Sequence, residues 1–311
     1  MPLPSASARP LLDSGVLSRL TRMQLQVSSP MLGSVTGMHR SATRGASVEF
    51  AEYRKYVPGD DPKNIDWQVY ARSDRFYIKE FEADTNLRAY LVVDSSGSMN
   101  FQSEHGTRID YARAMAAHLA YMLVQQGDAV GLHCCGQHDN TDLPARQAPT
   151  HLQNIFSQLE NLSPRGESTL IPALHDLAER VQRRAVIIIL SDAFMPADLL
   201  LDAIQHLRFC RHEVTFFQLL DPQELKFDFS RPIRFVDLEG GADLVADPSV
   251  VQSTYLEAME NHMSTLRTGL RKYHVDHRMC PIDQHFEQVL SAFLLSSQSR
   301  KSKGGGGGHR K

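Results

Sequence analysis

The sequence predicts an α/β protein built on a doubly wound, mostly parallel β-sheet that follows an N-terminal extension. Between residues 88 and 296, short apolar segments alternate with amphipathic segments of about ten to twenty residues, the pattern of successive βαβ units. Residues 185–190 are apolar without alternation, as expected of a central parallel strand covered on both faces. An apolar fraction of 42% across 311 residues allows a substantial core.

Apolar spacing predicts the elements of this fold in chain order. Residues 16–27 have a helical spacing, and residues 88–94 form the first strand of the sheet. Thr107, with Asp110 at the capping-box position, is expected to start a helix over 107–126. Further elements are expected as strands over 128–134, 185–190, 213–219 and 275–279, an edge strand over 233–237, and helices over 151–162, 170–182, 197–209, 250–273 and 282–295.

The chain is expected to divide into four segments. Residues 1–39 comprise the N-terminal helix and an irregular arm, and residues 40–87 form an extension packed on the main domain, which spans 88–298. Residues 299–311 contain the run KGGGGGHRK, whose composition cannot bury enough surface to become ordered. We therefore expect a disordered tail there.

Composition argues against several classes of partner and location. A net charge of -3 gives no electrostatic case for nucleic acid or acidic membranes. Residues 1–15 lack the apolar segment of a signal peptide, and no stretch of about 18 apolar residues is available to span a bilayer. The four cysteines show no CxxC spacing, so we expect buried free thiols. These features predict a soluble, cytoplasmic protein without membrane insertion.

The loop that leaves the first strand carries the clearest chemical pattern. Asp94, Ser96 and Ser98 alternate along it, and Gly97 permits a tight turn. In a doubly wound sheet, ligands bind beyond the carboxyl ends of the strands. One carboxylate and two hydroxyls there suit a hard divalent cation such as Mg²⁺, which prefers oxygen ligands.

Two further segments are expected at the same edge of the sheet. The strand over 185–190 delivers Asp192 just beyond its carboxyl end, beside the first loop if the two strands adjoin. The loop 165–169, which precedes the helix over 170–182, supplies a hydroxyl. Together these segments predict a metal site more specifically than any one of them.

The DxSxS pattern of Asp94, Ser96 and Ser98 resembles the metal ion-dependent adhesion site of von Willebrand factor A domains, whose fold is of the Rossmann type. Asp192 resembles the third segment of that site. In the middle segment, the family's usual Thr corresponds to Ser168, five residues before Ala173, and Thr169 is the alternative ligand by one register. The resemblance implies a Mg²⁺ or Mn²⁺ site that binds a carboxylate of a partner protein.

The segment upstream of this loop resembles the bacterial family known as domain of unknown function 58. This resemblance implies a partner of a MoxR-type AAA+ ATPase, because members are commonly encoded beside such ATPases, and a function as adaptor or co-chaperone. The signature residues that carry it are Arg54, Tyr56, Gly59, Asp60, Asp61, Asp66, Trp67 and Arg72.

The same upstream residues also have structural interpretations. Asp60 or Asp61 suits the cap of a helical turn starting near Pro62. Trp67, the only tryptophan, is expected to be a buried anchor with a bonded indole N–H. Residues 77–81 alternate as a strand. An ion-pair network that pins the extension to the main domain is expected among the charged residues Arg54, Asp60, Asp61, Asp66 and Arg72.

The sequence gives weaker support to other functional classes. A metal-dependent phosphoryl hydrolase using Asp94 and Asp192 is the main alternative, although residue 96 is Ser rather than a second Asp and no general base stands out. The loop lacks the GxSxG of a serine hydrolase, and the chain lacks GxxxxGK[ST], so any ATP chemistry would come from a partner. A scaffold with a vestigial metal loop is the third hypothesis.

Overall fold

The computed structural model describes residues 11–21, 23, 25, 48–57, 65–73, 75–83, 87–137, 140–227, 229, 233–235, 238 and 244–304. The chain divides into two compact units, one made of Met1–Ser29 with Leu87–Lys311 and one made of Pro30–Asn86. The larger unit carries the main sheet, whereas the smaller one contains a two-stranded sheet of its own.

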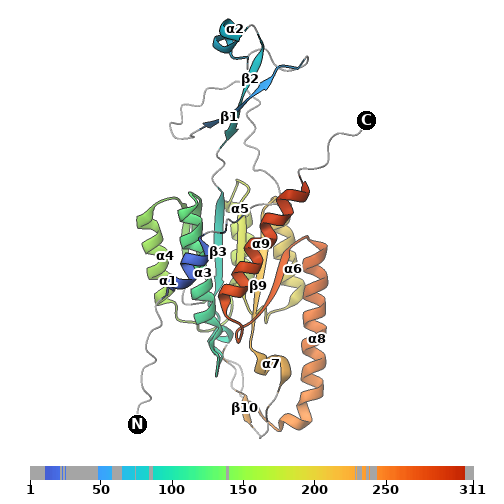
Figure 1. The fold of residues 1–311 in the computed structure, drawn as a ribbon. Coiled ribbons are helices and arrows are strands. Elements are labelled where there is room, and N and C mark those ends of the chain that lie inside the picture. Colours follow the sequence, from blue (N-terminus) through green and yellow to red (C-terminus); the bar gives the residue numbers. More distant parts are fainter. Residues whose placement is uncertain are drawn as a thin grey trace. The chain divides into compact units, whose positions relative to one another are not determined.

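The main sheet has six strands in the order β12-β9-β8-β3-β6-β7 (Figure 1). Five of them are parallel, and only β7 runs antiparallel to its neighbour. The predicted doubly wound, mostly parallel α/β fold is therefore confirmed. The strands are β3 (Arg88–Asp94), β6 (Ala129–Cys135), β7 (Thr141–Arg146), β8 (Val186–Ser191), β9 (Glu213–Leu220) and β12 (Asp276–Pro281).

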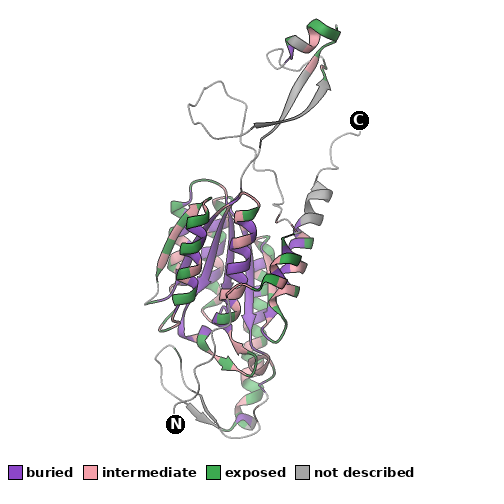
Figure 2. Ribbon diagram, turned by 60° about the vertical axis from the view of Figure 1, so that its left-hand side comes forward, coloured by how far each residue is buried: buried purple, intermediate pink, exposed green. Residues whose placement is uncertain are grey.

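Helices cover both faces of this sheet (Figure 1). On one face α3 packs on β3 and β6 and contacts α1, α4 and α9; on the other, α5 and α6 pack together and α6 contacts α8. These helices are α1 (Ser14–Leu20), α3 (Arg108–Gln125), α4 (Pro149–Asn161), α5 (Leu170–Arg180), α6 (Ala197–Phe209), α8 (Pro248–Lys272) and α9 (Phe286–Gly304). Figure 2 shows buried residues concentrated in the strands and in the inward sides of the helices.

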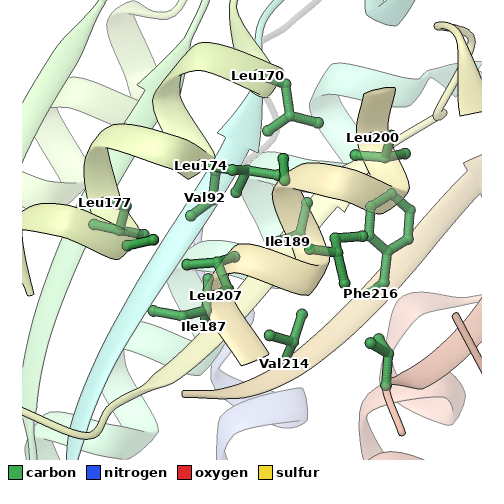
Figure 3. Close-up of a cluster of buried hydrophobic side chains, with 14 of the residues drawn as sticks. Val92, Leu170, Leu174, Leu177, Ile187, Ile189, Leu200, Leu207, Val214 and Phe216 are labelled. Atoms are coloured by element: carbon green, nitrogen blue, oxygen red, sulfur yellow. The ribbon is translucent and has the colours of Figure 1, made fainter. Parts of the chain in front are cut away.

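The hydrophobic core forms because alternate strand residues face the two helical layers. In Figure 3, Val92, Ile189 and Phe216 project from three strands toward leucines of α5 and α6. On the opposite face, the Phe217 ring packs edge-on against Phe293 of α9 at 5.2 Å. Every residue of β8 is buried, which confirms a central strand here, although it runs one residue later than the predicted 185–190.

Several predicted boundaries change in the structure. The first helix ends at Leu20 rather than at residue 27, and α9 begins at Phe286 rather than at 282 and continues to Gly304, into the segment expected to be a disordered tail. Residues 305–311 lie outside the described residues. The edge-strand prediction for 233–237 is wrong, because β10 (Ile233–Phe235) pairs with β11 (Leu244–Ala246) in a separate two-stranded sheet.

The smaller unit contains the predicted strand over 77–81, which is part of β2 (Tyr77–Ala83). It pairs antiparallel with β1 (Val48–Lys55), and α2 (Trp67–Ser73) lies between the two strands in sequence. The helix cap is Asp66, whose Oδ1 accepts a hydrogen bond from the Val69 N–H at 3.3 Å.

Trp67 corrects the prediction of a buried anchor. It is the first residue of α2 and is 59% exposed, and its ring meets the Tyr70 ring edge-on with the centroids 6.1 Å apart. Tyr56 packs near Phe76 at 6.1 Å, and Arg72 is exposed. Gly59, Asp60, Asp61 and the side chain of Arg54 lie outside the described residues, so the ion-pair network remains a prediction.

Within the described part of the chain, no helix combines the length and apolarity needed to cross a bilayer. The four cysteines are free thiols, and all but Cys210 are buried.

Candidate metal centre

Asp94 ends β3 and lies at the junction of three chain segments. Its side chain is completely buried. Oδ1 accepts hydrogen bonds from the Ser96 backbone N–H at 3.0 Å and from Ser168 Oγ at 3.2 Å, and Oδ2 accepts one from Ser191 Oγ at 2.7 Å. The structure thus brings the first loop, the middle loop and the end of β8 together around one carboxylate.

The first loop is held tightly against its neighbours. Ser96 and Ser98, on either side of Gly97, have their hydroxyl oxygens 3.0 Å apart. The Gly97 N–H donates to the carbonyl of Gly166 in the middle loop at 2.8 Å. A Cβ at Gly136 would lie 2.4 Å from Ser95 Oγ, so only glycine lets β6 end this close to the loop. The two serine hydroxyls therefore occupy a fixed place beside Asp94.

The middle loop presents both predicted hydroxyls. Ser168 Oγ, besides donating to Asp94, accepts a hydrogen bond from the Leu170 N–H at 3.2 Å. Thr169 precedes the first residue of α5, and its Oγ1 is buried without a hydrogen-bond partner among the described residues. One hydroxyl is thus already engaged and the other is not, and both remain candidate ligands.

Asp192 follows β8, the strand beside β3, and is buried. Its Oδ1 accepts a hydrogen bond from the Phe194 N–H at 3.1 Å. Its Oδ2 lies 3.3 Å from Arg108 Nη1, a distance typical of an ion pair, but makes no hydrogen bond to any described group. Ala193 has a left-handed backbone with φ of 63°, a conformation that is costly for a residue with a Cβ. The turn that aims Asp192 is therefore strained.

Arg108 is the main component of this site that the sequence reasoning missed. Its guanidinium is buried and lies 5.4 Å from the ring of Phe101 and 5.2 Å from that of Phe194. It donates to Glu224 Oε2 at 2.8 Å and to the Ser98 carbonyl at 2.6 Å. Glu224 belongs to α7 (Pro222–Lys226), which follows β9.

A signal for Arg108 was present in the sequence. It stands four residues before Ala112 and seven before Met115, so it lies on the buried stripe of its helix, where a charged residue requires a partner.

The carboxyl edge of the sheet buries more negative than positive charge. Asp94, Asp192 and Asp221 end three neighbouring strands, and Glu224 is mostly buried beside them; among the described residues, the cation that pairs with this group is Arg108. Burial, reinforced by Asp192, raises the pKa of Asp94 to about 6. Burial also raises the pKa of Glu224 to about 7, although Arg108 opposes the shift. Both shifts arise mainly because burial disfavours the charged form of a carboxyl group.

The donor set suits a hard divalent cation. It consists of carboxylate and hydroxyl oxygens, the ligand type that Mg²⁺ prefers. Two of these oxygens, Asp192 Oδ2 and Thr169 Oγ1, are buried without hydrogen bonds. Among the described residues, no three histidine, cysteine or acidic side chains converge as a metal cluster. A cation at this edge would therefore depend on the serine and threonine hydroxyls as well as on the carboxylates.

Comparisons with known proteins agree with the family resemblance. An uncharacterised protein of Mycobacterium tuberculosis (strain H37Rv) is 27% identical over 266 residues, which covers 83% of this chain and 82% of the relative. The uncharacterised protein YeaD of Bacillus subtilis is 25% identical over 109 residues, or 35% of this chain and 25% of that protein.

Two solved structures are also similar. The conserved hypothetical protein BatB from Bacteroides thetaiotaomicron matches 70% of this chain and 100% of its own, with a TM-score of 0.47 and 17% identity. The SpRpn10 VWA domain matches 43% of this chain and 76% of its own, with a TM-score of 0.34 and 13% identity. Residues 52–264, more than half of the chain, match the family described as "Protein of unknown function DUF58", and the chain belongs to that family.

Proposed function

We propose that this protein is a metal-dependent protein-binding module. Asp94 and Asp192 would hold Mg²⁺ or Mn²⁺, directly or through water, together with hydroxyls of the first and middle loops. An acidic side chain of the partner protein would occupy a remaining coordination position, so that binding depends on the metal. The proposed ligands are Asp94, Ser96, Ser98, Asp192 and either Ser168 or Thr169.

The observation that carries this proposal is the excess of buried carboxylates around Asp94. Burying a charge without a counterion costs several kcal/mol, and Arg108 alone cannot balance the group. A divalent cation would supply the missing charge. It would also give a partner to the oxygens of Asp192 and Thr169 that make no hydrogen bond to any described group.

We further propose that the partner is a MoxR-type AAA+ ATPase or one of its clients, met in the cytoplasm, with this chain as adaptor or co-chaperone. The support is the family resemblance carried by the upstream signature. The ATPase would supply the nucleotide chemistry, because this sequence contains no phosphate-binding GxxxxGK[ST] motif.

Calorimetry with Mg²⁺ and Mn²⁺, followed by capture of the purified ATPase with Mg²⁺ and with EDTA, tests both levels of the proposal. Asp94→Asn keeps the shape of the side chain but removes its charge, so we expect metal binding and capture to be lost. Asp198→Asn, the same change at an exposed position on α6, is the control and should behave as wild type.

Three results would count against the proposal. Metal-independent capture by both wild type and Asp94→Asn would exclude the adhesion mechanism. No binding of either metal at millimolar concentration would favour a scaffold with a vestigial loop. Turnover of phosphoesters that Asp94→Ala abolishes would favour the hydrolase. The described groups bonded to Asp94 and Asp192 are serine hydroxyls, backbone N–H groups and Arg108, and no general base is among them.

The middle ligand can be assigned with two variants. Ser168→Ala removes a hydrogen bond to Asp94, whereas Thr169→Val removes a hydroxyl that has no hydrogen bond to lose. If Thr169 is the ligand, Thr169→Val should weaken Mg²⁺ binding without reducing the stability of the metal-free protein.

A further inference from the structure

The amino edge of the main sheet, where its parallel strands begin, gathers the ends of three helices. Residues 180–184 lead from α5 into β8, residues 208–213 from α6 into β9, and residues 271–276 from α8 into β12. These connections touch one another. Arg208 Nε donates to the Tyr273 carbonyl at 3.0 Å, and the Ala185 N–H donates to His212 Nδ1 at 3.2 Å. We call residues 180–184, 208–213 and 271–276 the basic rim.

The basic rim contains seven arginines and lysines and only two acidic residues. Both acidic residues are already engaged, Glu213 with Arg184 and Asp276 with Arg278. Four cations of the rim are exposed and make no ion pair with any described residue: Arg183, Arg211, Arg271 and Lys272. The rim therefore carries a local positive charge that the net charge of -3 for the whole chain conceals.

One aromatic ring of the rim is left almost fully exposed among these cations. Phe209, the last residue of α6, is 85% exposed and lies between Arg208 and Arg211 in the chain. Cations at helix C-termini are favourable because they face the negative end of the helix dipole. That effect accounts for the arginines and lysines but not for a phenylalanine left almost entirely in water.

We propose that the basic rim docks on an anionic lipid bilayer, with the Phe209 ring entering the headgroup region. An apolar ring flanked by cations matches the two layers of such a surface, where acyl chains lie just beneath anionic headgroups.

Nucleic acid is the other polyanion to consider. Proteins that bind single strands use several aromatic side chains, on which successive bases stack. The rim has one free ring, since Tyr273 is half-buried with its hydroxyl bonded to Gln205 Oε1 at 2.8 Å. A lone ring favours the bilayer.

The test is co-sedimentation of the full chain with phosphatidylcholine vesicles, with and without phosphatidylglycerol. We expect binding only with phosphatidylglycerol, and a decline as salt is raised. One cation near an anionic surface is worth about a fivefold change in affinity, so Arg183→Glu and Arg211→Glu should each weaken binding by more than that. Phe209→Ser should weaken binding while leaving the salt dependence unchanged.

Two matched control variants, both outside the basic rim, test whether the effect is specific to the rim. Lys226→Glu makes the same charge change at an exposed site on α7, beyond the carboxyl end of β9, and Leu199→Ser removes an exposed apolar side chain from the first turn of α6. Both should sediment as wild type.

The proposal is overturned if wild type ignores phosphatidylglycerol, or if the rim variants bind as wild type. It is also overturned if homopolymeric RNA binds through Arg211 and displaces the vesicles while Phe209→Ser has no effect. Calorimetry with Mg²⁺ on the rim variants distinguishes a failure of this proposal from a failure of the proposed metal site.

Discussion

The two edges of the main sheet differ in whether their charged side chains are buried or exposed. At the carboxyl edge, Asp94, Asp192, Asp221 and Glu224 are wholly or mostly buried around Arg108. At the amino edge, the cations of the basic rim are mostly exposed, and several make no ion pair with described residues. A buried charge is retained at a cost in stability, whereas an exposed one costs little. This difference supports the two proposals, a cation bound at the carboxyl edge and a surface contact at the amino edge.

The largest expected effect compares one substitution at both edges. Arg108→Met should lower the free energy of unfolding of the metal-free protein by about 3–5 kcal/mol, because it leaves Glu224 and Asp192 buried without their cation. Arg211→Met should change it by less than about 0.5 kcal/mol. Urea denaturation in EDTA measures both. Equal effects would remove the distinction between the edges.

The next effect is the pH dependence of stability at the carboxyl edge. The pKa of Asp94 is raised to about 6 by burial, above the ordinary value of 3.8, so the folded state holds this proton more tightly than the unfolded state. The stabilisation is complete below pH 4 and is lost as the pH rises through about 6. Its size is at most about 3 kcal/mol.

Burial lowers the pKa of several histidines, among them His133 and His212. Their effect on the pH dependence of stability has the opposite sign. The informative quantity is therefore a difference between two proteins. Asp94→Asn should gain stability relative to wild type as the pH rises from 4 to 7, as measured by denaturation in EDTA. A flat difference would contradict the buried-charge interpretation.

A smaller effect concerns Thr107, the N-cap of α3. Thr107 Oγ1 accepts a hydrogen bond from the Asp110 N–H at 3.2 Å and donates to Asp110 Oδ2 at 2.8 Å. Thr107→Ala should cost about 1 kcal/mol of stability. Thr265→Ala on α8, where the hydroxyl bonds only its own helix, is the control and should stay within about 0.5 kcal/mol.

The smallest effect tests the basic rim alone. Arg183→Ala should leave the free energy of unfolding unchanged within about 0.5 kcal/mol, because the side chain is exposed and lies in a connection between elements. A loss above 1 kcal/mol in thermal or chemical unfolding would show that this arginine serves the fold rather than a surface.

Much of the fold follows from local patterns. The parallel strands have apolar side chains toward both layers, and Thr107 caps the N-terminus of α3, as the capping-box pattern predicts. The antiparallel strand β7 escaped prediction because TDLPAR is half-exposed and contains Pro144. Trp67 misled because an aromatic residue is usually buried, and one sequence cannot show on which side of a short helix it lies.

Only part of the candidate site could likewise be predicted from the sequence. Asp94 and Asp192 stand at the carboxyl ends of two neighbouring strands, so topology predicts that they meet. Ser191 and Arg108, which hold Asp94 and Asp192, act through contacts across 97 and 84 positions of the chain, and no local pattern reports such contacts. The basic rim is likewise assembled from three connections that are far apart in the sequence. Their positive charge is concealed by the net charge of -3 for the whole chain.

Pro144 has a consequence for how copies of this protein meet. It lies in β7, the outermost strand beside β6, and proline has no N–H to offer a further strand. Asp142 and Arg146, also exposed along this strand, add charges that disfavour edge-to-edge pairing. Pairing of this edge strand with a strand of a second molecule is therefore disfavoured.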